Sequence, residues 1–178
     1  MPPEAVLPIS YCDRCPRLVV TSLPGRDSWA LEELMDTVVA RDPSARFEAT
    51  GYRGVVEVYS SLSPDEIARQ FLLYQHAFIA RVVPVLACST PERLGEAMAR
   101  LVPKGLSAGL ELKVRVPLKG RVSEGAVKEA LRVAGVALRG REANLKVVVE
   151  SVGDCLLISV GEWRSCGPHC AVLVPVLP

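Results

Sequence analysis

The first half of the chain carries hydrophobic patterns that predict six elements in the order strand, helix, strand, strand, helix, strand. Residues 18–22 are a β-branched run that ends at a Leu-Pro-Gly turn, which predicts a buried strand. Apolar side chains recur at helical spacing from Trp29 to Val39, and Ser63 begins a capping box with Pro64 next, so each region predicts a helix. The other three strands are expected over residues 46–48, 55–59 and 78–87.

The second half predicts a helix, a strand, a helix and two further strands. Residues 110–118 alternate between apolar and charged side chains, which indicates a half-buried strand with a charged outer face. Gly153-Asp154 predicts a hairpin turn between two apolar runs. The helices are expected from Thr90-Pro91 to Val102 and from Ser123 to Ala134, and the paired strands over residues 145–152 and 155–160. The expected fold class is α+β, and the first six elements follow the split βαβ, ferredoxin-like order.

Composition indicates a folded protein without a membrane span. Of the 178 residues, 49% are hydrophobic, which excludes a disordered chain, and no uncharged stretch reaches the roughly 20 residues that cross a bilayer. The Pro-rich N-terminus lacks the basic start and apolar run of a secretory signal, so we expect a cytoplasmic protein. Scarce amides and abundant arginine are typical of heat-adapted proteins, in which intracellular cysteines can form disulfides.

Five candidate metal ligands lie near the two ends of the chain. A Cys-x-x-Cys pair near the start and a Cys-x-x-His-Cys group near the end supply soft ligands in two short turns, as tetrahedral zinc requires. We therefore predict a structural zinc site that fastens both termini to the body. A disulfide between the ends or free thiols are the alternatives, and either His169 or Cys170 could complete the shell. The predicted ligands are Cys12, Cys15, Cys166, His169 and Cys170.

Three stretches carry a resemblance to a known family: FIARVVPVLA leading into Ser89-Thr90-Pro91-Glu92, then LELKVRVPLKGR, then VALRGREANLKVVVESVGDCLLISVG. Together with the order of elements over about residues 18–162, they resemble the THUMP-domain RNA-binding proteins. In that family a ferredoxin-like domain precedes the THUMP domain. The chain departs from the family at residues 141–144, where Arg-Glu-Ala-Asn replaces a frequent Asn-Pro-Asp turn.

The resemblance implies a domain organisation and a role. It implies a Cys-containing arm at 1–17, a ferredoxin-like domain at 18–88, a THUMP domain at 89–162 and a Cys/His-containing arm at 163–178. THUMP domains deliver tRNA, by its acceptor end, to a modification domain, and no motif of such a domain is found in this sequence. The chain is most similar to the free-standing adaptor of tRNA cytidine acetylation. This implies a non-catalytic protein that presents tRNA to a separate modifying enzyme, an acetyltransferase acting on cytidine.

A basic segment is the candidate RNA surface. Between Lys113 and Lys146 nine residues are basic and three acidic, although the whole chain has a net charge of only +1. Such a segment can neutralise phosphates by counterion release, and without aromatic side chains it favours recognition of backbone and shape over base stacking. A solvated face crossed by ion pairs such as Glu124 with Lys128 is the alternative. The candidate residues are Lys113, Arg115, Lys119, Arg121, Lys128, Arg132, Arg139 and Arg141.

Two other functions compete with RNA binding. One is a small hydrolase or redox enzyme that uses the cysteines at the ends of the chain, and the other is a protein-interaction module in which the acidic first domain docks a partner. Cys88 and Cys155, within apolar runs, are expected to be small buried hydrophobic residues. His76 is expected at a helix end and Trp29 in the core.

Overall fold

The computed structural model describes residues 8–176, which form two compact units. One unit contains residues 16–85 and 162–175, and we call it the α1–α2 unit after its helices. The other contains residues 8–15, 86–161 and 176, and we call it the α3–α4 unit. Strand β10 (Cys155–Gly167) begins in the α3–α4 unit and ends in the α1–α2 unit. Within residues 8–176, no helix has both the length and the apolar character needed to span a bilayer.

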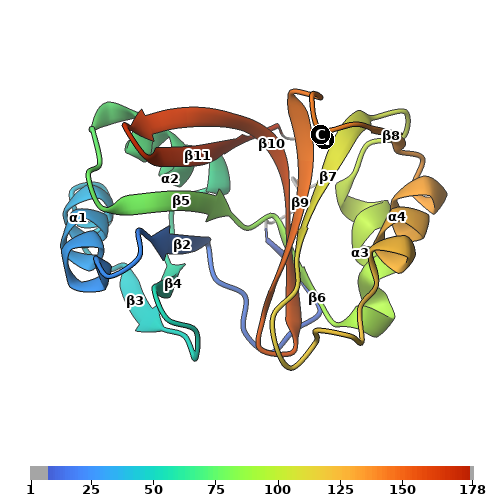
Figure 1. The fold of residues 1–178 in the computed structure, drawn as a ribbon, viewed down its shortest axis with the longest axis horizontal. Coiled ribbons are helices and arrows are strands. Elements are labelled where there is room, and N and C mark those ends of the chain that lie inside the picture. The colour runs from blue at the N-terminus through green and yellow to red at the C-terminus, as the bar shows by residue number, and fades with distance from the viewer. Residues whose placement is uncertain (1–7, 177–178) are drawn as a thin grey trace. The chain divides into compact units, whose positions relative to one another are not determined.

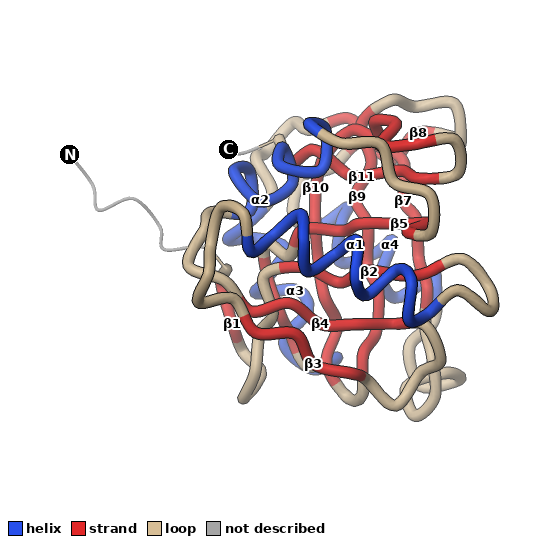
Figure 2. Tube along the Cα trace, turned by 90° about the vertical axis from the view of Figure 1, so that its left-hand side faces the viewer, coloured by secondary structure: helices blue, strands red, loops and turns tan. Residues whose placement is uncertain are grey.

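The α1–α2 unit is a sheet covered by two helices. Its strands lie in the order β3-β4-β2-β5-β11, followed by the end of β10. Figure 2 looks onto this unit and shows α1 and α2 lying across the same side of the strands. The elements are β2 (Leu18–Ser22), α1 (Asp27–Val39), β3 (Arg46–Ala49), β4 (Val55–Tyr59), α2 (Pro64–Gln70), the 3-10 turn η1 (Phe71–Leu73), β5 (Ile79–Pro84) and β11 (Cys170–Pro175).

Local sequence accounts for the elements of this unit. The Ser63 hydroxyl accepts a hydrogen bond from the Glu66 N–H at 3.1 Å, so the predicted cap begins α2. The chain order β2, α1, β3, β4, α2, β5 matches the predicted order of the first six elements. Trp29 was expected in the core, but its side chain is 55% exposed, and the buried residues of α1 are Ala30, Leu34, Thr37 and Val38.

Asp42 joins the loop after α1 to the loop after β4. Its carboxylate accepts hydrogen bonds from the Ser44 and Ser60 hydroxyls, each at 2.6 Å, and from the Ser61 N–H at 3.0 Å. These bonds stabilise the charged form, so they hold the pKa of Asp42 well below its ordinary value of 3.8. Asp42 is 5% exposed, so these hydrogen bonds are formed in the interior.

Replacing Asp42 by asparagine is expected to lower the free energy of unfolding by about 1–3 kcal/mol at neutral pH, because amide hydrogens would face the serine donors. A carboxylate with a depressed pKa stabilises the fold above its ordinary pKa, and this contribution is lost as the pH falls. Denaturant unfolding from pH 7 to pH 2 should therefore show a flatter acid limb for Asp42→Asn than for the parent. Parallel curves for the two proteins would contradict this role.

The α3–α4 unit is a second sheet with two helices on one face (Figure 1). Its strands lie in the order β10-β9-β7-β8, with β6 antiparallel to β10 and β1 parallel to β6. The elements are β1 (Ile9–Ser10), β6 (Ala87–Ser89), the 3-10 turn η2 (Pro91–Arg93), α3 (Leu94–Leu101), β7 (Ser107–Lys113), α4 (Glu124–Val133), β8 (Ala137–Arg139) and β9 (Leu145–Val152).

The predicted turns and caps of this unit are present. The Ser123 hydroxyl accepts from the Ala126 N–H at 3.1 Å at the start of α4, and Gly153, with φ of 62°, lies in the turn between β9 and β10. The strand expected over 110–118 instead ends at Lys113 and begins earlier, at Ser107. Pro117 lacks an N–H to donate to a neighbouring strand, and the chain turns there through a cis Val116–Pro117 bond.

The described parts of the two predicted arms, at 1–17 and 163–178, belong to the two compact units. Residues 8–15 belong to the α3–α4 unit, whereas residues 162–175 complete the sheet of the α1–α2 unit. Strand β11 pairs in parallel with β5, where Val172 lies opposite Val82, and both side chains are fully buried. No strand was predicted after Cys170, because a strand buried on both faces does not alternate in polarity. This replaces the predicted boundaries at 17, 88 and 162.

Candidate nucleic-acid interface

Four of the predicted RNA-binding residues line one hollow of the α3–α4 unit. Lys128 and Arg132 reach it from α4, Arg139 from the end of β8, and Arg141 from the loop that follows. Leu110 and Leu138 supply apolar lining, and Glu124 and Gly140 complete the wall. The hollow has a volume of about 270 Å³. The four cations, which extend over 13 positions of the sequence from Lys128 to Arg141, thus surround one concave surface. With Glu124 counted, the lining has a net charge of +3.

Neighbouring groups fix the loop that carries Arg141. The ammonium of Lys146, a buried residue of β9, donates to the Arg141 carbonyl at 2.5 Å. A Cβ at Gly140 would lie 2.8 Å from the Glu142 carboxylate, so only glycine fits there without moving Glu142. The Arg139 guanidinium donates from Nε to the Ser107 hydroxyl at 2.6 Å. Lys146 and Gly140 were not among the predicted site residues, because their role is visible only once the strands are paired.

Each cation of α4 has a carboxylate within reach on the same helix. Lys128 lies 3.5 Å from Glu124 and Arg132 lies 3.7 Å from Glu129. Both pairs are solvent-exposed i,i+4 or i,i+3 contacts, which contribute only about 0.3–0.5 kcal/mol and exchange readily for a phosphate. Arg141 forms no ion pair with any described residue. The hollow therefore keeps a positive field available to an anion.

The other four predicted residues lie outside this hollow. Lys113, Lys119 and Arg121 are exposed at the end of β7 and in the following turn. Arg115 instead belongs to the interior: its guanidinium pairs with Glu150 at 2.5 Å and donates to the Ser151 carbonyl at 2.8 Å. The side chains of Arg115 and Glu150 are only 11% and 1% exposed. Strand alternation placed Arg115 on the outer face, but the chain leaves the strand two residues earlier.

All six cysteines form disulfides, and this corrects the predicted zinc ligands. Cys12 bonds to Cys155, Cys15 to Cys88, and Cys166 to Cys170. The first two bonds lie in the α3–α4 unit and the third in the α1–α2 unit, so the two predicted Cys pairs belong to different units. His169 is exposed in the β10–β11 turn. Cys88 and Cys155 are buried as expected, but as disulfide partners of the N-terminal segment.

A different metal-binding group is present in the α1–α2 unit. One ring nitrogen of His76 and the sulfur atoms of Cys166 and Cys170 lie within 4.8 Å of one another, and all three residues are buried. These three could hold a metal ion if the disulfide were open. His76 was expected at a helix end, where it would contact the helix dipole. It is instead 2% exposed, and its Nε2 lies 2.9 Å from the Thr37 hydroxyl.

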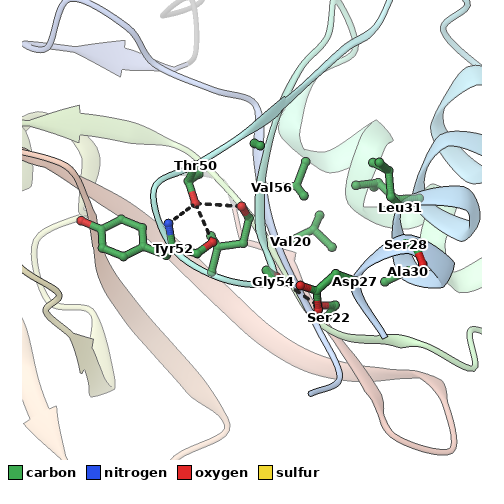
Figure 3. Close-up of a pocket in the computed structure, with 13 residues that line it drawn as sticks. Val20, Ser22, Asp27, Ser28, Ala30, Leu31, Thr50, Tyr52, Gly54 and Val56 are labelled. Atoms are coloured by element: carbon green, nitrogen blue, oxygen red, sulfur yellow. Dashed lines mark hydrogen bonds between the residues drawn. The ribbon is translucent and has the colours of Figure 1, made fainter. Parts of the chain in front are cut away.

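A further hollow, of about 240 Å³, lies between α1 and the β3–β4 hairpin (Figure 3). Its lining is mostly apolar and includes Val20, Leu31 and Val56. Its polar groups bond to one another: the Ser22 hydroxyl donates to Asp27 at 3.1 Å, and the Thr50 hydroxyl donates to the Val55 carbonyl at 2.8 Å. Among the described residues, the cationic lining that suits a polyanion is found in the α3–α4 unit.

Comparison with known proteins gives a likeness of fold. No protein-family model matches the chain, and no curated protein matches it. Three solved structures are similar: PH1313 from Pyrococcus horikoshii (TM-score 0.57, 15% identity, 84% of this chain), TrmN from Thermus thermophilus (0.50, 21%, 80%), and a 4-thiouridine synthetase–RNA complex with bound ATP (0.55, 12%, 89%). The chain spans 55%, 44% and 43% of these three chains. At these identities the likeness is one of mixed α/β fold alone.

Proposed function

We propose that the chain is a THUMP-domain RNA-binding protein whose RNA surface is the hollow of the α3–α4 unit. The observation that carries this proposal is the convergence of Lys128, Arg132, Arg139 and Arg141 on one concave surface. Guanidinium groups remain charged at every physiological pH and match the geometry of phosphate oxygens. Exposed cations around a hollow can therefore neutralise phosphates of a folded backbone without reading its sequence.

The fold supports the same proposal. One of the solved structures of similar fold is a 4-thiouridine synthetase in complex with RNA. The sequence stretches that resemble THUMP proteins include strand β9, the adjoining part of β10 and the loop that carries Arg141. The chain order β2, α1, β3, β4, α2, β5 of the α1–α2 unit supports the proposal of a ferredoxin-like companion domain, which the resemblance implies.

We propose further that the protein binds tRNA by its acceptor end and presents it to a separate modifying enzyme, an acetyltransferase acting on cytidine. In this role the chain itself is an adaptor and carries out no reaction. The side chains of the hollow suit that role, because arginine and lysine position phosphates by charge and do not exchange protons readily near neutral pH. The rival functions, a Cys-dependent enzyme or an RNA-independent interaction module, predict no salt-dependent RNA affinity.

Removing the arginines of the hollow is expected to weaken tRNA binding in a salt-dependent manner. If Arg132, Arg139 and Arg141 each neutralise one phosphate, the triple alanine variant should reduce the slope of log affinity against log salt by about 2 to 3. The measurement is fluorescence anisotropy with whole tRNA at several salt concentrations. The affinity should fall for every tRNA sequence to a similar extent, because phosphate contacts carry no sequence information.

The matched control replaces three exposed arginines of the other unit, Arg26, Arg41 and Arg53, by alanine. This variant loses the same net charge but none of the hollow, so its salt slope should stay close to that of the parent. Equal slopes for parent and hollow variant would rule out this surface. Equal losses in both triple variants would show that only overall charge matters. A tRNA trimmed at its 3′ end should bind more weakly than whole tRNA, and equal binding would remove the acceptor-end assignment.

A further inference from the structure

The His76, Cys166 and Cys170 side chains form a buried group that the proposed RNA function does not use. His76 is 2% exposed, Cys166 1% and Cys170 5%. Their ligand atoms, one ring nitrogen and two sulfurs, lie within 4.8 Å of one another. Two thiolates and an imidazole are the ligands that Zn²⁺ prefers in proteins. The residue types and their spacing therefore resemble an incomplete zinc shell whose sulfur atoms are joined by a bond.

The backbone holds His76 beside Cys166 independently of the disulfide. The His76 N–H donates to the Cys166 carbonyl at 2.8 Å. Gly167 allows this approach, since a Cβ there would overlap the His76 carbonyl oxygen. Cys166 is the next-to-last residue of β10 and Cys170 is the first residue of β11, and both belong to the core of the unit. Opening the disulfide would thus leave the three side chains in place.

Each ring nitrogen of His76 has its own hydrogen-bond partner. Nε2 lies 2.9 Å from the Thr37 hydroxyl, and Nδ1 lies 3.0 Å from the Cys166 carbonyl. Whichever nitrogen binds a metal, the other keeps a partner that orients the ring. Histidine ligands of metal sites have such a partner in almost every case, because it fixes the tautomer and the ring plane.

We propose that reduction of the Cys166–Cys170 disulfide creates a zinc site formed by His76, Cys166 and Cys170. A dithiol reductant supplies two electrons and two protons: it becomes a disulfide, the Cys166–Cys170 bond breaks, and two thiols form. Zn²⁺ then binds both sulfurs as thiolates and releases the two protons to solvent. Tetrahedral binding places the two sulfurs about 3.8 Å apart, a separation that a hairpin can reach with small side-chain rotations.

This disulfide is the one whose opening the fold tolerates best. It joins residues only 4 positions apart, whereas the other two join residues 143 and 73 apart. The stabilisation from closing a loop grows with loop length, so the Cys166–Cys170 bond contributes least by this effect. His76 also lines a hollow of about 220 Å³ together with Glu33 and Asp36. The negative charge of these carboxylates favours a cation beside the ring.

Cobalt binding tests the site on the full chain. The protein is reduced with a phosphine in the absence of oxygen and titrated with Co²⁺, whose spectrum reports thiolate charge transfer and tetrahedral geometry. We expect one equivalent of Co²⁺ to bind to the reduced protein, Zn²⁺ to displace it, and the oxidised protein to bind none. Absence of a thiolate band in the reduced protein overturns the proposal, as does equal binding by the oxidised protein.

Two variants assign the ligands. Cys12→Ala/Cys155→Ala keeps the proposed group and should bind Co²⁺ like the parent, whereas Cys166→Ala/Cys170→Ala should lose the thiolate band. His76→Gln should weaken Co²⁺ affinity at least tenfold and change the band positions. Equal binding by the Cys166/Cys170 variant assigns the metal to other thiols and refutes the site, and an unchanged spectrum for His76→Gln removes His76 from it. Should Cys166→Ala/Cys170→Ala not fold, the spectrum of His76→Gln still decides whether this group holds the metal.

Discussion

Removing the two disulfides of the N-terminal segment is expected to destabilise the α3–α4 unit more than any other change considered above. Cys12–Cys155 and Cys15–Cys88 close loops of 143 and 73 residues. Loops of this size correspond to about 2–4 kcal/mol for each bond, because each one restricts the unfolded chain. Alanine at all four positions should therefore lower the melting temperature by about 10 °C or more.

The structure gives a second reason for this expectation. The segment is attached by a two-residue strand, β1, in which Ile9 pairs with Ala87 of β6 and is 6% exposed. So short a strand pair is marginal without further attachment. Without the disulfides, the segment should detach before the unit unfolds, and trypsin should cleave after the exposed Arg14 at a lower temperature than in the parent.

The control is Cys166→Ala/Cys170→Ala, which removes two sulfurs instead of four and a disulfide that closes a loop of only 4 residues. Its melting temperature should fall much less. Calorimetry of the parent under oxidising and reducing conditions gives an independent measurement without substitution. If Cys166→Ala/Cys170→Ala loses as much stability as the four-alanine variant, loop length does not explain the effect. If the four-alanine variant melts like the parent, the disulfides add nothing to the stability of the fold.

Replacing Arg115 by alanine is expected to lower the free energy of unfolding by about 3–5 kcal/mol. The substitution removes the Arg115 guanidinium from the Glu150 carboxylate, which is 1% exposed. It also removes the donor to the Ser151 carbonyl. Replacing an exposed cation such as Arg121 should change stability by less than about 0.5 kcal/mol, and Arg121→Ala is therefore the control.

A double variant separates lost charge pairing from lost packing. Arg115→Met/Glu150→Leu removes both charges and should recover most of the stability that Arg115→Ala loses, since well-packed apolar pairs often replace buried ion pairs at no cost. Urea unfolding of the two single variants and the double variant gives the coupling energy. A coupling energy near zero would mean that the pair does not contribute as a unit. Any loss of tRNA affinity in Arg115→Ala should then follow its unfolded fraction.

Hydrophobic periodicity predicted the helices and most strands, because each of these elements depends on residues that are close in the sequence. The caps at Ser63 and Ser123 and the turn at Gly153 are local signals, and each lies where it was predicted. Strand β11 was missed for a physical reason: it is buried on both faces, so its side chains do not alternate in polarity. The short strand β8, of three residues, carries too few positions for a period to be visible.

The sequence predicted which segment carries the cations of the basic hollow, but not which of these cations line it. Charge counting identified the segment that contains Lys128, Arg132, Arg139 and Arg141, because an excess of cations is a property of the sequence. It could not separate these from Arg115, because burial depends on where β7 ends and on Glu150, which lies 35 residues away. Nor could it show that Lys146 fixes the loop of Arg141.

The sequence by itself determined the order of the four α-helices and of the strands between them apart from β6 and β8, together with a mixed α and β composition and the location of the cationic segment. Only the tertiary structure decided which cysteines meet. Cys12 and Cys15 find partners 143 and 73 residues away because β10 and β6 pair with Leu157 opposite Cys88, and no spacing in the chain encodes that register. The same holds for His76, whose neighbour Cys166 is 90 residues distant. Helices and strands can be predicted because their side chains repeat with a fixed period along the chain. A site depends on contacts between distant segments, and this period does not specify which segments pair.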